Sequence, residues 1–374
     1  MIRILHFITD TNIGGAGRLL CSQIKHMESK DFEIYVALPK GSMLCSKIRD
    51  LPCSALELSH GADRSLDSLS IVEALKVIRS IRPDIVHSHG SLSSRIAATL
   101  LGIPCRVFTR HCVFPLPSSL TNPISKIILG STNNVLSTSV IAVAESARQN
   151  LVDMGCDNKK IRTIINGVDP LRELSEDEKD ICRKAYGITR RNFVISIFAR
   201  LEEYKGHRTL LEAADICKRY YPNFKFLIVG DGSQKEELIA LAKKLQLDST
   251  VIFTGFCDDV APIFNITHLN VNCSYGTETS SLALSEGMSL GIPAVASDYG
   301  GNTHMVKNAV NGLLKKKKNA DAHAMAIIRM YRDTDLYSKC SAGALRRYEA
   351  EFTAQAMSKR MEDFYKTEYA IRKK

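Results

Sequence analysis

The sequence lacks tryptophan altogether, and aromatic residues make up only 7% of its 374 positions. None of its 11 cysteines forms a CxxC pair, which fits reduced thiols in a cytosolic protein better than a disulfide framework or a zinc site. No stretch approaches the roughly 18 apolar residues of a membrane-spanning helix. The segment Met1–Ile8 is too short and its flanks are too polar for a signal peptide. We therefore expect a cytoplasmic protein that contacts a membrane at most peripherally.

Acidic residues are fewer than basic ones, and the formal net charge is +10. This balance favours an anionic partner: nucleic acid, anionic lipid head groups or a phosphorylated small molecule. Hydrophobic residues make up 45% of the chain and charged residues 24%, as in an average globular protein. A chain of this length and composition buries two ordinary cores, so we expect two domains.

Short apolar strands alternate with amphipathic helices twice along the chain. The expected strands are Ile4–Ile8, Glu33–Leu38, Ile85–His89, Arg106–Thr109 and Val140–Val143, and then Phe193–Phe198, Phe224–Val229, Val251–Thr254, Leu269–Asn272 and Ala294–Ser297. The expected helices lie near Arg18–Met27, Ser68–Ser80, Leu92–Leu101, Ser146–Met154, His207–Tyr220, Lys235–Leu245 and Ser281–Leu290. This alternation predicts the α/β class, with parallel sheets that helices cover on both faces.

Turn residues cluster at Asn166–Pro170 and divide the pattern into two blocks. We predict two doubly wound, Rossmann-like domains, residues 1–168 and residues 169–352, that face each other across a cleft. Doubly wound sheets bind ligands at the carboxyl ends of their strands. The candidate ligand-binding motifs follow expected strands, and that shared position is stronger evidence than any one motif.

The most informative segment contains two glutamates, Glu278 and Glu286, around an expected helix start. Small polar residues precede an apolar run that ends at Gly291–Pro293, as in a capped helix with a sharp stop. Free backbone N–H groups near Ser280 to Leu282 suit an anion, because the helix dipole and the unpaired donors point outward there. Carboxylates accept hydrogen bonds from vicinal hydroxyls. The segment therefore predicts a ligand in which a sugar is joined to a phosphate.

Arg200 and Lys205 follow the first strand of the second block and are five positions apart in one loop. Both side chains are expected to converge on a diphosphate, the guanidinium as a fork and the ammonium as a point charge. A solvated basic loop is the plainer explanation. Gly230 and the pair Gly255-Phe256 end the next two strands, where glycines would admit a nucleobase, although simple turns explain them equally well.

Three motifs follow strands of the first block. Gly14 and Gly15 lie in a glycine-rich turn that is not GxGxxG, so a Rossmann dinucleotide site is disfavoured. His89 and the pair Arg110-His111 end two further strands and suit proton transfer or sugar binding. A loop or core position is the commoner fate of any one histidine. No carboxylate or cysteine stands at a helpful spacing for a metal, and we expect no metal site.

Three remaining segments have simple explanations. Arg332–Asp335 contains the Asp-x-Asp spacing of metal-dependent glycosyl transfer enzymes, but it lies between two helical stretches and is expected to cap a helix. Lys315–Lys318 is expected to be a solvated loop, although four lysines also suit an anionic membrane. The apolar stretch Cys112–Pro117 suits an acceptor pocket, a lipid contact or burial in the first domain.

Taken together, these segments resemble a retaining glycosyltransferase of family 4, a group with the GT-B fold. The Glu-x7-Glu pair with Arg-x4-Lys carries the resemblance, which covers almost the whole chain. It implies that Arg200 and Lys205 hold the donor diphosphate and stabilise its departing charge. It also implies that Glu286 binds the ribose, that Glu278 binds hydroxyls of the transferred sugar, and that amides near Ser281 and Leu282 meet the distal phosphate.

The same resemblance places the base of the donor near Phe256 and Cys257. In the first domain, Gly15 lets the diphosphate or the acceptor pass close to the backbone, and His111 lies beside the anomeric centre. His89 and Arg110 are assigned with Gly14 to the acceptor. The family uses no metal or other cofactor and is thought to retain the anomeric configuration. Its final helix, here Ala354–Tyr369 within residues 353–374, crosses back to the first domain.

The sequence departs from the family where the donor sugar would lie. Many members follow the first glutamate with Gly-Phe-Pro, and this chain has Thr279-Ser280-Ser281 instead. A glutamate that often follows the Gly-Gly turn is His304 here. The identity of the donor sugar is therefore not transferable from the family.

The leading hypothesis is transfer of a sugar from a nucleotide-diphosphate donor to a hydroxyl of a glycan or a polyprenyl-linked acceptor. One alternative is a GT-B nucleotide-sugar epimerase, which would isomerise the donor without an acceptor; a phosphorylase has no distinct signal. Another is a non-catalytic protein that binds nucleic acid or an anionic membrane. We expect no nucleic-acid partner, because no RNA-binding motif is present and the lysines do not form one stripe.

Overall fold

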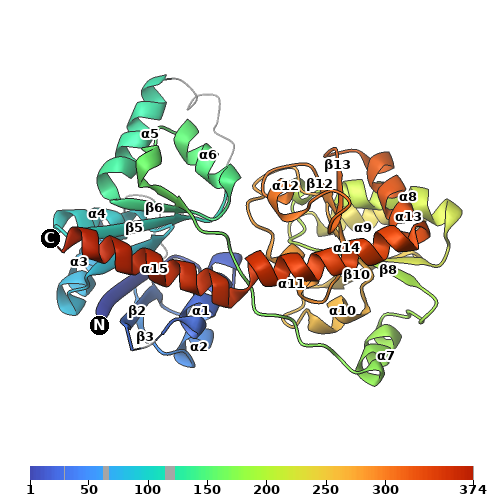
Figure 1. Ribbon diagram of the computed structural model, residues 1–374, viewed down its shortest axis with the longest axis horizontal. Coiled ribbons are helices and arrows are strands. Elements are labelled where there is room, and N and C mark those ends of the chain that lie inside the picture. Colours follow the sequence, from blue (N-terminus) through green and yellow to red (C-terminus); the bar gives the residue numbers. More distant parts are fainter. Residues whose placement is uncertain (29, 62–66, 114–122, 374) are drawn as a thin grey trace. The chain divides into compact units, whose positions relative to one another are not determined.

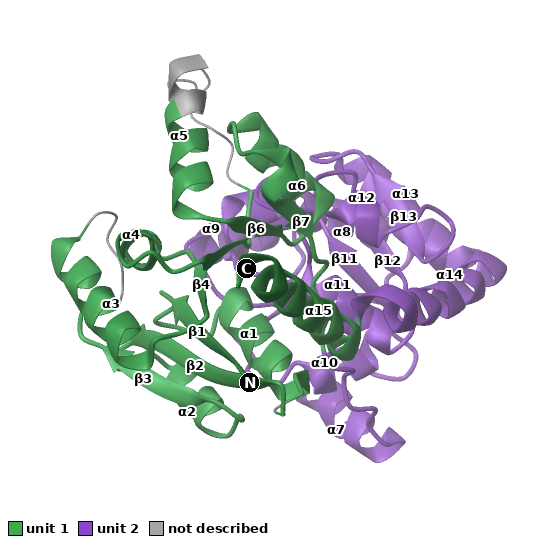
Figure 2. Ribbon diagram, turned by 60° about the vertical axis from the view of Figure 1, so that its left-hand side comes forward, with its two compact units in different colours: residues 1–168, 353–374 green, residues 169–352 purple. Residues whose placement is uncertain are grey.

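The computed structural model describes residues 1–28, 30–61, 67–113 and 123–373 (Figure 1). It divides into two compact units, residues 1–168 with 353–374 and residues 169–352 (Figure 2). Of the apolar stretch Cys112–Pro117, only Cys112 and Val113 lie among the described residues. Among the described helices, none has both the length and the apolar character to cross a bilayer.

The first unit contains a parallel sheet of seven strands in the order β3-β2-β1-β4-β5-β6-β7. Its strands are β1 (Ile2–Ile8), β2 (Phe32–Pro39), β3 (Ser54–Leu58), β4 (Ile85–His89), β5 (Cys105–Arg110), β6 (Ser139–Ala142) and β7 (Ile161–Thr163). Its helices are α1 (Gly15–His26), α2 (Leu44–Arg49), α3 (Ser68–Ile81), α4 (Leu92–Leu100), α5 (Pro123–Leu136), α6 (Glu145–Asp153) and α15 (Ala354–Arg372).

The second unit contains a parallel sheet of six strands in the order β10-β9-β8-β11-β12-β13. Its strands are β8 (Phe193–Phe198), β9 (Phe224–Val229), β10 (Val251–Gly255), β11 (Leu269–Asn272), β12 (Ala294–Ser297) and β13 (Gly312–Lys315). Its helices are α7 (Glu176–Ala185), α8 (His207–Tyr220), α9 (Lys235–Lys244), α10 (Ala261–Ile266), α11 (Leu282–Ser289), α12 (Asn302–Met305), α13 (Ala320–Arg332) and α14 (Thr334–Arg347).

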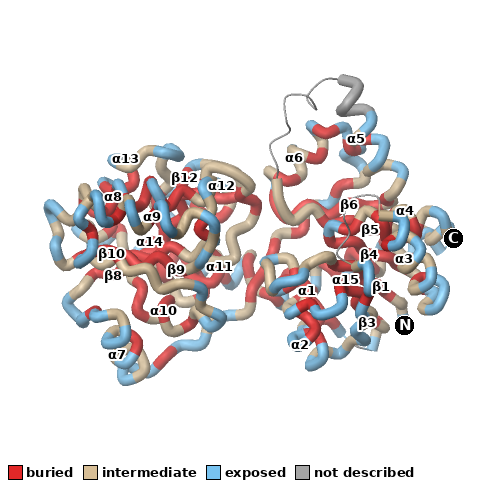
Figure 3. Tube along the Cα trace, turned by 180° about the vertical axis from the view of Figure 1, so that it is seen from behind, coloured by how far each residue is buried: buried red, intermediate tan, exposed pale blue. Residues whose placement is uncertain are grey.

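The central strands of both sheets are buried on both faces, as their apolar runs require, whereas the edge strand β3 is largely exposed. Figure 3 shows the buried segments gathered in the two sheets. Each sheet separates two apolar layers. In the second unit, one layer joins β8 and β9 to α8 and α13, and the other joins them to α7 and α10. The α/β prediction is confirmed. The sequence did not reveal the edge strands β3, β7 and β13, of which β7 has only three residues.

The helix α15 belongs to the first unit although it follows the second unit in the chain. The side chain of Tyr365 is fully buried, and its hydroxyl lies 2.5 Å from Nδ1 of His87 in β4 and accepts a 3.3 Å hydrogen bond from Nε2 of Gln23 in α1. Glu362 accepts a hydrogen bond from the amide of Glu28 at 2.6 Å. The predicted cap is confirmed as well, because Asp333 is the N-cap of α14.

Removing one hydroxyl from α15 tests how strongly this helix stabilises the first unit. The substitution Tyr365→Phe leaves His87 Nδ1 and the Gln23 amide without their buried partner, and we expect a loss of about 1–3 kcal/mol in the free energy of unfolding. Thermal unfolding should show the first unit melting several degrees lower. Tyr369→Phe, one turn later on the same helix, should leave the melting temperature unchanged; equal effects of the two substitutions would contradict this account.

Candidate active site

The candidate donor residues lie in loops that follow two neighbouring strands of the second sheet. From β8 the chain first adds β9 and β10 on one side and then returns to add β11 on the other side. Adjacent loops at such a switch point diverge and leave space for a ligand. Arg200 and Lys205 follow β8, and Glu278 follows β11. The switch point therefore brings together residues that are more than seventy positions apart in the sequence.

Lys205 and Glu278 form an ion pair at the centre of this region. The Lys205 ammonium lies 2.9 Å from Oε2 of Glu278, and the two side chains are 18% and 5% exposed. Asn272, the last residue of β11, donates to the same carboxylate oxygen at 3.4 Å. A carboxylate this deeply buried needs a charged partner and further hydrogen bonds, and here both are supplied by residues at strand ends.

The partners of Glu278 decide its charge. Burial alone would raise the pKa of its carboxyl group, but the charge of Lys205 and hydrogen bonds from Ser274, Lys205 and Asn272 outweigh that effect and hold the pKa below its ordinary value of 4.5. Glu278 is therefore ionised at neutral pH and accepts hydrogen bonds only. A buried acceptor of this kind suits a ligand with hydroxyl groups.

A glycine pair fixes the backbone of Glu278. The amide of Gly301 donates to the carbonyl of Glu278 at 3.2 Å. A Cβ atom at Gly301 would lie 1.3 Å from the carbonyl oxygen of Thr279, and one at Gly300 would lie 2.3 Å from that of Glu278. No side chain fits between the two loops. The Gly300-Gly301 turn after β12 thus packs directly against Glu278 and Thr279, where the segment begins in which this chain departs from the family pattern.

The helix start beside Glu278 differs by one residue from the expectation. Ser281 is the N-cap of α11, and its hydroxyl accepts from the amide of Leu284 at 3.3 Å. Its own amide points at Sδ of Met305, 3.1 Å away. Leu282 and Ala283 are the first two residues of α11, so their amides have no acceptor within the helix. An anion at this helix start would therefore meet Leu282 and Ala283 rather than Ser281.

Glu286 lies four residues beyond the first residue of α11 and is only 4% exposed. The structure thus places both glutamates in buried positions on the same loop–helix segment. Arg200 behaves differently, because its guanidinium donates to the hydroxyl of Tyr204 at 2.8 Å and its side chain is exposed. Lys205 contacts Glu278, and its ammonium also lies 5.8 Å from the ring centroid of Tyr204, the residue that Arg200 contacts. The convergence of Arg200 and Lys205 on a diphosphate stays a prediction.

The residues assigned to the base lie at the ends of β9 and β10. Gly230 has a φ of +142°, and a Cβ atom there would lie 2.1 Å from the carbonyl oxygen of Ala199. Its amide donates to the carbonyl of Gly255 at 2.9 Å, which joins the ends of the two strands. Phe256 is 71% exposed, an unusual position for a large apolar ring. Next to it, Cys257 is half-buried.

In the first unit, Gly14 is the N-cap of α1, and Gly15 is its first residue. The start of α1 already contains a carboxylate. Oδ2 of Asp10 would lie 3.1 Å from a Cβ atom at Gly14, and the amide of Gly17 donates to this carboxylate. Burial raises the pKa of Asp10 against the opposing effect of that hydrogen bond. Asp10 follows β1 by two residues, and its position after a strand was the signal that would have identified it.

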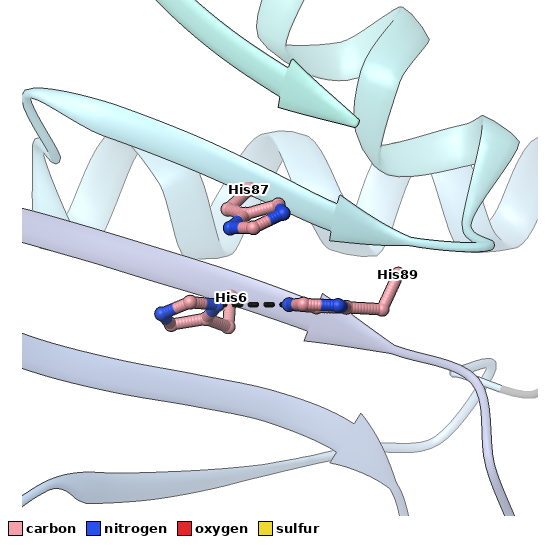
Figure 4. Close-up of side chains that lie close together, drawn as sticks. All are labelled: His6, His87 and His89. Atoms are coloured by element: carbon pink, nitrogen blue, oxygen red, sulfur yellow. Dashed lines mark hydrogen bonds between the residues drawn. The ribbon is translucent and has the colours of Figure 1, made fainter. Parts of the chain in front are cut away.

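His89 and His111 are brought together, as their strand ends suggested. Nδ1 of His89 lies 3.0 Å from Nε2 of His111, and Nε2 of His89 lies 3.0 Å from Nδ1 of His6 in β1 (Figure 4). His6 was not predicted; it is a buried histidine in an apolar strand, paired in register with His87 across β1 and β4. Arg110 ends β5, where burial lowers the pKa of its guanidinium.

His6, His87 and His89 also have the spacing of a metal site, because one nitrogen from each lies within 4.8 Å of the others. Two observations favour hydrogen bonding instead. The rings of His87 and His89 stack with their centroids 4.2 Å apart, so their in-plane lone pairs run side by side rather than toward one point. Both nitrogens of His87 are also engaged, by the Tyr365 hydroxyl and by Oγ1 of Thr109 at 2.6 Å.

Comparison with known proteins matches both halves of the chain. Residues 13–172 match the model of Glycosyltransferase Family 4, and residues 178–347 match that of Glycosyl transferases group 1. The UDP-Gal:alpha-D-GlcNAc-diphosphoundecaprenol alpha-1,3-galactosyltransferase of Escherichia coli is 26% identical over 89% of this chain and 88% of its own length.

Solved structures share the fold over nearly the whole chain. Anabaena Alr3699/HepE, crystallised with UDP and glucose, superimposes with a TM-score of 0.84 at 20% identity and covers 98% of this chain and 100% of its own. A glycosyltransferase from Rickettsia africae ESF-5 reaches 0.83 at 21% identity over 98% of both chains. The predicted GT-B fold is confirmed by these likenesses.

The ion pair of Glu278 predicts how stability depends on pH. Because the folded-state pKa of Glu278 is lowered, its contribution is present above the ordinary value of 4.5 and is lost as the pH falls through the lower folded-state value. Glu278→Gln should therefore lower the free energy of unfolding at pH 7 by about 2 kcal/mol, the range for hydrogen bonds to a charged group. In thermal unfolding, the gap to the wild type should narrow as the pH falls below 4.5. A constant gap would contradict this prediction, and exposed Glu236→Gln serves as the control.

Proposed function

We propose, because this chain belongs to glycosyltransferase family 4 and its second half to the glycosyl transferases group 1, that it moves a hexosyl residue from a UDP-sugar to a hydroxyl of a lipid-linked glycan. The donor class is supported by the UDP-galactose of the Escherichia coli relative and the UDP of the Anabaena structure. The acceptor class is supported by the diphosphoundecaprenol substrate of that relative.

The observation that carries the proposal is the buried pair of Lys205 and Glu278 at the start of α11. An ammonium group has three donors, so Lys205 can hold Glu278 and a diphosphate oxygen together. The diphosphate would attract the ammonium and relieve Glu278 of part of its partner. The carboxylate then has acceptor capacity for sugar hydroxyls. One residue pair thus joins the phosphate and sugar halves of the donor.

The remaining donor contacts follow from the same arrangement. The amides of Leu282 and Ala283 face the distal phosphate, and Glu286 accepts hydrogen bonds from the ribose hydroxyls. The exposed ring of Phe256, with Gly230 and Cys257 nearby in the β9 and β10 loops, stacks on the base. Arg200 leaves Tyr204 and adds a second positive charge to the diphosphate.

The reaction breaks the bond between the anomeric carbon and the diphosphate oxygen and forms a bond from that carbon to the acceptor oxygen. The proton of the acceptor hydroxyl passes to the departing diphosphate, on the face from which it leaves, and the configuration is retained. Lys205 and Arg200 stabilise the charge that develops on the diphosphate, the role that a metal ion fills elsewhere. The proposal therefore includes metal-independent transfer without another cofactor.

The acceptor is assigned to the first unit. Gly14 and Gly15 have no side chains at the start of α1, where the Asp10 carboxylate lies. His89 and Arg110 end β4 and β5, and His111 directly follows β5. His111 is placed beside the anomeric centre. For a lipid-linked acceptor, the enzyme would work at the cytoplasmic face of the membrane, held there peripherally by its positive charge of +10.

Transfer activity tests the proposal directly. Incubation with a panel of radiolabelled nucleotide sugars and an N-acetylglucosaminyl diphosphate lipid should give labelled product with a UDP-hexose. Lys205→Ala should lower kcat/KM by about a hundredfold, the loss typical for one charge-stabilising contact. Glu286→Ala, which removes the ribose contact, should lower kcat/KM as well. Undiminished transfer in both variants would reject the site, and an isomerised donor without acceptor would favour an epimerase. Addition of EDTA should leave the rate unchanged.

Binding measurements separate the two ends of the donor. Glu278→Gln should weaken binding of the UDP-sugar by about tenfold, the factor for a lost charged hydrogen bond. It should leave UDP bound at least as tightly, because Lys205 loses its competing carboxylate. Lys205→Ala should weaken both ligands. Calorimetry on these variants, with Glu236→Gln as the control, measures the affinity for each ligand. Equal weakening of UDP and UDP-sugar binding by Glu278→Gln would show that this residue does not contact the sugar.

A further inference from the structure

Three histidines of the first unit form a continuous hydrogen-bonded chain. His6 Nδ1 meets His89 Nε2 at 3.0 Å, and His89 Nδ1 meets His111 Nε2 at 3.0 Å. At both contacts the ring centroids lie 5.3 Å apart although the nitrogens are 3.0 Å apart, and the ring planes differ by only 23° and 28°, so the rings meet edge to edge and each nitrogen faces its neighbour nearly in the plane of the ring. Figure 4 shows the first contact as a dashed line between β1 and β4, with His87 stacked beside it.

All three rings are neutral at physiological pH. Burial lowers the pKa of His6 to about 3 and that of His111 to about 4, and it holds the pKa of His89 well below 6.5, with smaller contributions from neighbouring histidines. A neutral imidazole carries one proton, so one nitrogen donates and the other accepts. Each of the two contacts therefore contains one proton.

These requirements leave only two arrangements. If His89 carries its proton on Nδ1, it donates to His111 Nε2, His111 is protonated on Nδ1, and His6 must donate from Nδ1. If His89 carries its proton on Nε2, it donates to His6, and His111 must donate from Nε2. The three protons therefore lie all on Nδ1 or all on Nε2. A change at His6 is transmitted to His111 even though the two rings share no hydrogen bond.

We propose that His6 and His89 are positioning residues that set which nitrogen of His111 carries the proton, and hence whether its Nδ1 presents a donor or an acceptor. The effect on catalysis rests on the proposed function, in which His111 lies beside the reacting centre. Nε2 of His6, at the far end, is buried and has no hydrogen-bond partner among the described residues. The chain therefore ends inside the protein and serves to orient His111 rather than to deliver protons from solvent.

His87 provides a matched control because its protonation is fixed separately. Burial raises the pKa of the Tyr365 hydroxyl, which stays protonated. That hydroxyl accepts from Gln23, so its single proton goes to His87 Nδ1. His87 then carries its own proton on Nε2 and donates to Thr109. It is as deeply buried as His6 and stacks on His89, but it takes no part in the chain.

The protonation pattern is measurable by NMR of the protein labelled with ¹⁵N-histidine, in which two-bond proton–nitrogen correlations distinguish the two tautomers. In the wild type we expect His6, His89 and His111 to carry their protons on the same type of nitrogen. His6→Phe keeps a ring of similar size but removes the contact, and the correlations of His111 should change. His87→Phe should leave the tautomer of His111 unchanged. A mixed pattern in the wild type, or an unchanged His111 in His6→Phe, overturns the proposal.

Kinetics test the consequence for the reaction. His6→Phe should lower kcat by about tenfold, the factor that corresponds to one hydrogen bond, with the KM for the nucleotide sugar unchanged. The exposed His60→Phe should change neither constant. An unchanged kcat in His6→Phe overturns the positioning role. If the wild type transfers no sugar, the proposed function fails, and the NMR pattern of the wild type still decides whether the chain of histidines is coupled.

Discussion

The ion pair between Lys205 and Glu278 exists because β8 and β11, which are far apart in the chain, are neighbours in the second sheet. Their carboxyl ends open toward the same edge, and the loops beyond them must diverge. Asn272, at the end of β11, donates to the carboxylate, and the Gly300-Gly301 turn after β12 holds the backbone of Glu278. The electrostatics of the site thus follow from the order of the strands.

The regular elements were largely predictable from the sequence. Strands β4, β8, β9, β11 and β12 have the expected bounds, because each is a short apolar run between turn residues. The candidate residues were found by their position after such strands, which needs only the rule that parallel strands end at one edge. The Glu278 segment and Lys205 were found in this way, and the structure places them in contact.

The remaining features depend on contacts that no local pattern encodes. His6 looks like any residue of an apolar strand, and its role appears only when β1 and β4 pair in register. Whether the Arg200 guanidinium contacts a phosphate or the Tyr204 hydroxyl depends on its side-chain rotamer, which the sequence does not encode. The short strand β7 has too few residues for a periodicity to emerge. The sequence indicates which loops form the site, and tertiary packing determines which side chains contact one another there.

The hydroxyl of Tyr365 reaches His87 from a helix that the ribosome makes only after the whole second unit. Domains generally fold as units, the earliest to emerge folding first. The first unit emerges from the ribosome first, but it lacks α15 at that stage, so the side of its histidine cluster that α15 covers is still exposed. The second unit is continuous in sequence and has all its residues once Phe352 has emerged. The half of the chain that is made later is therefore the half that is completed first.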